Sequence, residues 1–124
     1  MTAMLAAMLA CVHSMYDPPP IVLTFSPGFQ PPASLNTGAY AGIAVTATNG
    51  PLNGNEVGFS CTPVGACGTF TPGSAASTIP VCYLAPDLVP PNNTVTVTAT
   101  SSVDGTKSIS ATITIENGPG QACP

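Results

Sequence analysis

Cysteine is the residue type in this chain with the widest chemistry, because a thiol can form a disulfide, bind a metal ion, act as a nucleophile or accept an acyl chain. The sequence contains five cysteines, at Cys11, Cys61, Cys67, Cys82 and Cys123. It has no C-x-x-C pair and one histidine, so both a zinc site and a redox motif lack their usual residues. The odd number of cysteines, in a Thr/Ser-rich chain with one Lys, suggests an exported protein with one thiol set apart from paired ones.

The other side chains that could catalyse a reaction are few and scattered. His13 is the only base available to a Ser or Cys nucleophile, and it lies alone near the N-terminus. A glycoside hydrolase needs two facing carboxylates, and the candidates are far apart in the sequence, at Glu56, Asp87, Asp104 and Glu116. We therefore expect no enzyme, no catalytic or metal-binding residue and no cofactor.

Two ligand-binding alternatives stay open. Asp87 and Asp104, together with loop carbonyl groups, could hold a calcium ion. Tyr40 could stack on a sugar, although one ring is a weak platform and the chain has no Trp. We expect Tyr83 to pack in the core instead, with its hydroxyl holding the loop that follows it.

The composition excludes two classes of partner. One Lys or Arg stands against five Asp and Glu, so the chain can neither neutralise a phosphate backbone nor be drawn electrostatically to anionic lipids. We therefore expect no nucleic acid as partner. The length of 124 residues fits one domain, and 15 Pro and 12 Gly are typical of short strands joined by many turns.

The clearest elements are two strands within residues 93–116. Apolar and polar residues alternate in both, so one face of each is apolar: Val95, Val97 and Ala99, then Ile109, Ala111, Ile113 and Ile115. Asp104-Gly105 in the joint between them tolerates the positive φ of a tight turn. This pattern predicts an antiparallel hairpin whose apolar face needs a second sheet as cover.

Five more short strands are expected, at 21–25, 39–49, 57–61, 68–71 and 77–84. About seven antiparallel strands without a helix predict an all-β fold, an immunoglobulin-like β-sandwich of two sheets. We expect the strands around Val45 and Phe59 to cover the hairpin. The expected organisation is an apolar signal or anchor with a Pro-rich tether at 1–20, the immunoglobulin-like domain at 21–117 and a Gly/Pro-rich tail at 118–124.

The N-terminal residues 1–10 are apolar and uncharged, and as a helix they would be only about 15 Å long, too short to span a bilayer. They could form the apolar region of an export signal. Leu9-Ala10-Cys11 resembles the end of a bacterial lipobox, in which the cysteine is acylated. No Lys or Arg precedes the run, and Met8 stands where that motif most often has Leu. The alternative is an apolar helix, or a fragment of a longer chain, with Cys11 as a free thiol.

Four segments carry a resemblance to a protein family. They are IAVTATN at 43–49, VGFSCTPVGACGTF at 57–70, YLAP at 83–86, and the pattern from VTVTATS to SATITI within 95–115. In this order they resemble the bacterial immunoglobulin-like (Big-type) domain of exported and surface proteins, in its acidobacterial form. The family usually has Trp where Phe59 stands. The resemblance implies a module that occurs in adhesins, surface-anchored enzymes and unassigned exported proteins, so it leaves the function open.

The resemblance includes a small loop closed by cysteines, and we expect a Cys61–Cys67 disulfide there. Closing so short a loop stabilises the fold by about 2 kcal/mol. A Cys82–Cys123 disulfide would pin the C-terminal tail to the sandwich. The alternatives are a buried free thiol at Cys82 and an intermolecular link through Cys123. If Cys11 is acylated, the five cysteines divide into one anchor and two bridges.

The expected function is that of a non-catalytic structural or interaction module of an exported, cell-surface protein, with a small lipoprotein as one form. Its partner would be another protein or a neighbouring domain of the same kind, and it would touch the membrane only through a lipid on Cys11. The expected location is the cell surface, the outer membrane or the extracellular medium. The alternative is an accessory module that binds carbohydrate or calcium. An exposed apolar patch would favour interaction, and a concave cluster of aromatic or acidic side chains would favour ligand binding.

Overall fold

The computed structural model describes residues 19–49 and 55–124, and this part of the chain is all-β, as predicted. Its strands are β1 (Val22–Phe25), β2 (Ser34–Asn36), β3 (Tyr40–Ile43), β4 (Val45–Thr48), β5 (Glu56–Thr62), β6 (Thr69–Thr71), β7 (Ser74–Ala76), β8 (Val81–Leu84), β9 (Thr94–Ser101) and β10 (Ser108–Glu116). A single 3-10 turn, η1 (Pro91–Asn93), precedes β9. The strands are more numerous and shorter than the sequence predicted, because the expected strand at 39–49 divides at Ala44 and the Pro-rich stretch before it contributes β2.

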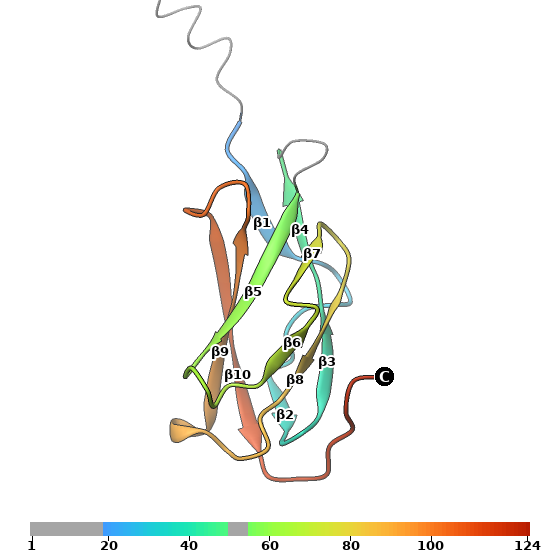
Figure 1. The fold of residues 1–124 in the computed structure, drawn as a ribbon, viewed down its shortest axis with the longest axis vertical. Coiled ribbons are helices and arrows are strands. Elements are labelled where there is room, and N and C mark those ends of the chain that lie inside the picture. Colours follow the sequence, from blue (N-terminus) through green and yellow to red (C-terminus); the bar gives the residue numbers. More distant parts are fainter. Residues whose placement is uncertain (1–18, 50–54) are drawn as a thin grey trace, which may run out of the picture.

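The strands form two packed layers (Figure 1). One layer is a five-stranded sheet in the order β2-β10-β9-β5-β7. The other consists of the ladders β1-β4 and β3-β8-β6, which are continuous through the chain because only Ala44 separates β3 from β4. Every pairing is antiparallel except that of β2 with β10, which is parallel. The predicted β-sandwich is therefore present, with one parallel pair at an edge.

The predicted hairpin is the strands β9 and β10, which pair from Ser108 opposite Thr100 to Thr114 opposite Thr94. Most of its apolar face is buried, since Val95, Val97, Ala99, Ile113 and Ile115 are each at most 1% exposed, whereas Ile109 and Ala111 are half-buried. The threonines of β9 alternate with the buried residues and lie on the other face. Alternation in the sequence therefore identified the buried face correctly, because successive strand residues point to opposite sides of a sheet.

The turn between these strands is held by Asp104. Its carboxylate accepts hydrogen bonds from the backbone N–H of Thr106, at 3.0 Å, and from the Thr106 hydroxyl, at 2.6 Å. These two bonds lower the pKa of Asp104, with a smaller contribution from the charge of Lys107. The predicted Asp-Gly turn is thus stabilised by hydrogen bonds to one of its own side chains.

The cover of the hairpin comes from the second layer, whose buried side chains are Leu23, Ile43, Val45, Val81 and Tyr83. The expectation for Val45 is confirmed, but the expectation for Phe59 is wrong. The strand β5 pairs with β9, with Phe59 opposite Ala99, and so it extends the sheet of the hairpin instead of covering it. Alternation shows which face of a strand is buried, but it does not show which strands become neighbours in one sheet.

Three aromatic rings connect the two layers at one end of the core. The rings of Phe59 and Phe70 are stacked with centroids 5.6 Å apart, and those of Phe70 and Tyr83 are tilted at 5.1 Å. Such ring pairs contribute about 0.5–1.5 kcal/mol each beyond the area that they bury. Phe70 therefore packs between Phe59 of one layer and Tyr83 of the other.

Within the part of the chain that the structure describes, no helix has the length and the apolar character needed to cross a membrane. The predicted signal or anchor segment and most of the tether, at positions 1–18, lie outside the described residues, and so does Cys11.

Candidate functional site

Four of the five cysteines are joined in two disulfides, the expected Cys61–Cys67 bridge and the Cys82–Cys123 bridge that the sequence left as one of several alternatives. Cys61, near the end of β5, is bonded to Cys67 over a Cα–Cα distance of 5.8 Å, and we call this the loop bridge. Cys82 in β8 is bonded to Cys123, 41 positions later, over 6.0 Å, and we call this the tail bridge. Both bridges have a structural role, because the sulfur atoms of a disulfide are not available as nucleophiles or as thiolate ligands of a metal.

The C-terminal tail is fixed against the body along its length. The side-chain amide of Asn36 donates a hydrogen bond to the carbonyl of Pro119, at 3.1 Å, and the Thr37 hydroxyl donates one to the carbonyl of Gly118, at 3.3 Å. The tail bridge then attaches it to β8, where Cys82 alternates with buried residues and therefore points away from the core. Residues 118–124 thus lie on the outer side of the second layer (Figure 1).

Tyr83 holds the small loop that the loop bridge closes. Its side chain is fully buried, and its hydroxyl donates a hydrogen bond of 2.6 Å to the carbonyl of Cys67. Burial raises the pKa of Tyr83 to about 12, because a phenolate cannot be solvated there. The expectation that Tyr83 packs in the core is confirmed. Its hydroxyl holds the loop before β6, however, and not the loop after β8 as we predicted.

Glycine at position 68 is required for this arrangement. Gly68 has a φ of +94°, and a Cβ atom there would collide with the carbonyl oxygen of Leu84 and lie 3.1 Å from the Tyr83 ring. Only a residue without a side chain lets the loop come this close to β8. The disulfide, the tyrosine hydroxyl and the glycine together fix the loop in one position.

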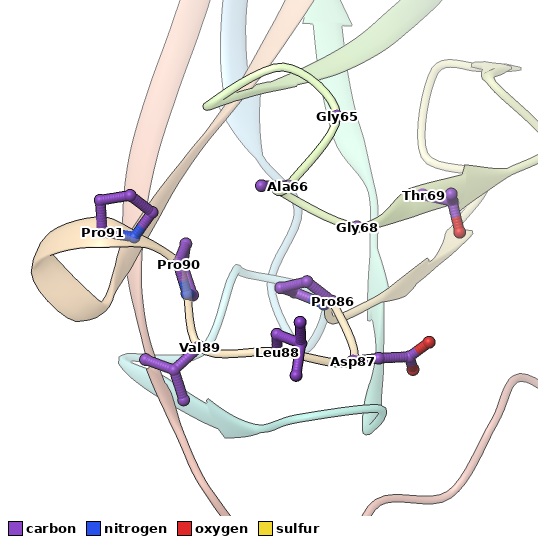
Figure 2. A pocket seen from close by; sticks show the side chains of 10 residues that line it. All are labelled: Gly65, Ala66, Gly68, Thr69, Pro86, Asp87, Leu88, Val89, Pro90 and Pro91. Carbon is purple, nitrogen blue, oxygen red and sulfur yellow. The ribbon is translucent and has the colours of Figure 1, made fainter.

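A groove of about 540 Å³ lies between this loop and the segment that leads into β9 (Figure 2). We call it the end groove, and it is lined by Gly65, Ala66, Gly68, Thr69, Pro86, Asp87, Leu88, Val89, Pro90 and Pro91. The wall opposite the loop contains three prolines, whose φ angles are fixed by their rings. That wall is also tied to the body, because the carbonyl of Pro86 accepts a hydrogen bond from the N–H of Gly38 at 3.1 Å. Both walls of the end groove are therefore preorganised.

The end groove is apolar except at one end. The carboxylate of Asp87 and the hydroxyl of Thr69 lie at that end, away from Pro90 and Pro91 (Figure 2). Leu88, which lines the groove, is 81% exposed, and Val64, which precedes the lining residue Gly65 in the loop, is 89% exposed. These are the two highest values among the exposed large hydrophobic residues of the described chain. Exposed apolar side chains that gather at one place mark sites of contact with other molecules. The groove can bury a partner's apolar side chain and offer it one carboxylate.

No pattern in the sequence pointed to the end groove, although both of its walls come from recognisable loops. Val64 lies in the loop between the two cysteines, and Leu88 lies in a connecting loop rich in proline. Neither loop has a periodic pattern, so no signal showed that these apolar residues would be exposed or that the two loops would form one groove. An isolated Val or Leu in a turn-rich segment was the only sign available.

The four candidate carboxylates do not come together as a pair. Asp87 precedes β9 and Asp104 follows it, so a strand of eight residues, about 25 Å long, separates them. Glu56 begins β5 at the end of the sandwich that holds the β9–β10 turn, and Glu116 ends β10 at the opposite end. The alternative of a calcium ion bound jointly by Asp87 and Asp104 is therefore excluded. Within residues 19–49 and 55–124, no group of three or more His, Cys, Asp or Glu side chains could hold a metal ion.

Two exposed rings lie on the outer side of the second layer. Tyr40 in β3 is 39% exposed, and Phe29, which the sequence did not single out, is 40% exposed beside Gly42. Cys82 is the register partner of Gly42 and carries the tail bridge, so the C-terminal tail occupies the same face. Little flat surface is left next to these rings for a sugar.

Comparison of the chain with protein-family models, with curated proteins and with solved structures gave no match. The candidate site is therefore interpreted from its geometry alone.

Proposed function

We propose that this chain is a non-catalytic interaction module of an exported, cell-surface protein. The observation that carries the proposal is the end groove, with rigid walls, the exposed side chain of Leu88 in its lining and exposed Val64 next to the lining residue Gly65 in the sequence. Solvent contact of two such side chains costs free energy that a partner would recover by covering them, at about 25 cal/mol for each Å² of apolar surface. The apolar lining of this groove favours a protein partner.

The immunoglobulin-like character of the module is part of this proposal. Such sandwiches have two packed sheets of antiparallel strands. In this chain, β10-β9-β5 packs on β3/β4 and β8, while β1 pairs with β4 and β2 pairs with β10. The Big-type resemblance of the sequence supports the same conclusion. Two disulfides are typical of proteins that fold outside the cytosol, which supports export.

We also propose that Cys11 is acylated and that residues 12–20 form a tether. Cys11 is the one cysteine outside the two bridges, and Asp17-Pro18-Pro19-Pro20 favours an extended, semi-rigid spacer. A single acyl chain binds membranes only marginally, so stable attachment needs the further acyl groups that lipoproteins carry.

The alternative function, an accessory module that binds carbohydrate, has Tyr40 and Phe29 as its supporting observation. The tail on the same face makes it the weaker candidate. A glycan array tests it: specific hits that disappear in the Tyr40→Ala variant would favour the alternative over the interaction module.

Site-specific photo-crosslinking of the full chain on intact cells tests the proposed function. A benzophenone side chain replaces Leu88 at the end groove, and in a matched sample it replaces Thr112, which is exposed on the outer face of β10. We expect protein crosslinks at position 88 and none at position 112, and we expect Val64→Asp to remove the crosslinks. In the same cells, added protease should reach the protein, and Cys11→Ser should move it from the membrane fraction to the medium or the periplasm.

Equal crosslinking at the two positions, or none at position 88, would contradict an interaction site in the end groove. Complete protection from added protease, with a mass showing free thiols at the four bridged positions, would contradict export to the surface. An unchanged membrane fraction in Cys11→Ser would contradict the anchor alone.

A further inference from the structure

We infer that the end groove binds the β9–β10 turn of a second copy of this chain, so that copies associate head to tail. This inference rests on the proposed function as an interaction module and names its partner. It follows from where the structure places the chain's exposed apolar side chains and its one basic side chain.

The β9–β10 turn carries the features that the end groove lacks. Val103 at its tip is 49% exposed. Lys107, at its end, is the only Lys or Arg in the whole sequence. The carboxylate of Asp104 in the same turn accepts two hydrogen bonds from Thr106, and its charge interacts with that of Lys107. Lys107 is nevertheless the one cationic group that this turn can offer to an acid of a partner.

The end groove supplies the complementary features. Leu88 and the prolines of the lining offer apolar surface to a side chain such as that of Val103, and Asp87 offers a carboxylate to Lys107. A turn is narrow enough to enter between two loops, whereas a flat sheet face is not. Charge complementarity of this kind fixes orientation and excludes wrong partners more than it adds affinity.

The turn and the groove cannot meet within one molecule. They lie at opposite ends of β9, and Figure 1 shows the β9–β10 turn and the η1 segment at opposite ends of the sandwich. Contact between them therefore needs a second copy, and the two surfaces differ, so each copy keeps one free groove and one free turn. Such a heterologous contact extends into a row of copies unless it closes into a ring.

The net charge of −4 on each copy opposes association only at short range. At physiological ionic strength, charges separated by more than about 8 Å are largely screened, so the local contact decides the outcome. A contact made by one turn and one groove is smaller than a standard protein interface, and we expect it to be weak in solution. Anchoring on one membrane would raise the effective concentration of the copies.

Sedimentation velocity of the full chain tests the inference. The samples carry Cys11→Ala, so that neither an acyl group nor a free thiol contributes, and two intact bridges and an unchanged circular-dichroism spectrum show that each variant folds. We expect a sedimentation coefficient that rises with concentration up to about 1 mM. Asp87→Lys places two cations in the contact and Lys107→Glu places two acids there, so each variant alone should associate at least tenfold more weakly.

A mixture of these two variants provides the decisive measurement. In the mixture, the turn of Asp87→Lys has its normal Lys107 and meets the normal Asp87 of Lys107→Glu, while the reverse contact pairs the new Glu with the new Lys. The mixture should therefore associate as the unchanged chain does, although neither variant does so alone. Thr112→Lys and Thr112→Glu, on the outer face of β10, control for the change of net charge and should not alter association.

Three outcomes would overturn the inference: no association up to 1 mM, no recovery in the mixture, or equal weakening by the two Thr112 variants. If association fails while crosslinks to a different protein form at position 88, the groove serves another partner, and the proposed function stands without this inference. If both experiments fail, the proposed function fails as well.

Discussion

Replacement of Tyr83 with Phe tests the most specific contact in the fold. The change keeps the buried ring and removes one oxygen, whose hydrogen bond of 2.6 Å holds the carbonyl of Cys67. Cys67 is 4% exposed, so water does not replace the lost donor easily. An unsatisfied buried polar group costs about 1–3 kcal/mol, and we expect Tyr83→Phe to lower the free energy of unfolding by about 2 kcal/mol.

Urea unfolding measures this change. For a domain of this size the slope is about 1–3 kcal/mol per M, so the midpoint should fall by about 1 M with the slope unchanged. Tyr40→Phe is the matched control, because Tyr40 is 39% exposed on the outer face of β3. Changes at such surface positions are usually within about 0.5 kcal/mol.

The effect of Tyr83→Phe should also depend on pH. Burial raises the pKa of Tyr83 to about 12 in the folded protein, whereas the unfolded chain has the ordinary value near 10.0. Between these two values the unfolded state binds fewer protons than the folded state, so stability falls as pH rises. The contribution is fully present below pH 10 and is lost as pH approaches 12. From pH 9 to pH 11 the loss amounts to about 1 kcal/mol.

The unchanged protein should therefore lose part of its advantage over Tyr83→Phe between pH 9 and pH 11, and absorbance at 295 nm should show one tyrosine that ionises late. Equal midpoints for Tyr83→Phe and Tyr40→Phe would refute the role of the hydrogen bond. A constant difference between the unchanged protein and Tyr83→Phe from pH 9 to pH 11 would refute the burial of the hydroxyl as the cause of the raised pKa.

Two further predictions concern the bridges and the glycine that shape the end groove. Serine in place of both cysteines of the tail bridge, which spans 41 positions, should cost about 4 kcal/mol, against about 2 kcal/mol for the loop bridge, which spans 6, because a longer loop loses more entropy on closure. Urea unfolding of the two double variants checks the order, and a larger loss for the loop bridge would contradict it. Gly68→Ala should destabilise by more than about 2 kcal/mol because of its positive φ and the collision with the carbonyl of Leu84. Gly73→Ala, with nothing within 4 Å of the added carbon, should be nearly neutral. Thermal unfolding of the two variants measures the difference, and equal effects at the two glycines would disprove the steric argument.

The sequence alone predicted the features that depend on local pattern. The alternation at Val95, Val97 and Ala99 identified the buried face, since side chains of a strand point alternately to its two sides. The Asp104-Gly105 turn followed from residues that tolerate positive φ. The spacing of the cysteines, together with the resemblance, predicted the loop bridge, and the tail bridge was one of several alternatives that the structure then formed.

Other features depend on which segments become neighbours, and no local pattern contains that information. Phe59 has the alternation of a covering strand, yet its strand joins the hairpin's own sheet, because the period of two is the same in either place. Tyr83 was expected in the core, but only the packed structure aimed its hydroxyl at Cys67, 16 positions earlier.

The end groove shows the same division. The chemistry of its parts can be read from the sequence: a loop with a cysteine at each end, a glycine at position 68, and a proline-rich segment that cannot enter a central strand. Tertiary structure alone brought the two loops together and left Leu88 exposed in the groove. The physical reason is that exposure depends on what the rest of the chain covers, and a loop residue without periodic neighbours carries no sign of being covered or left open.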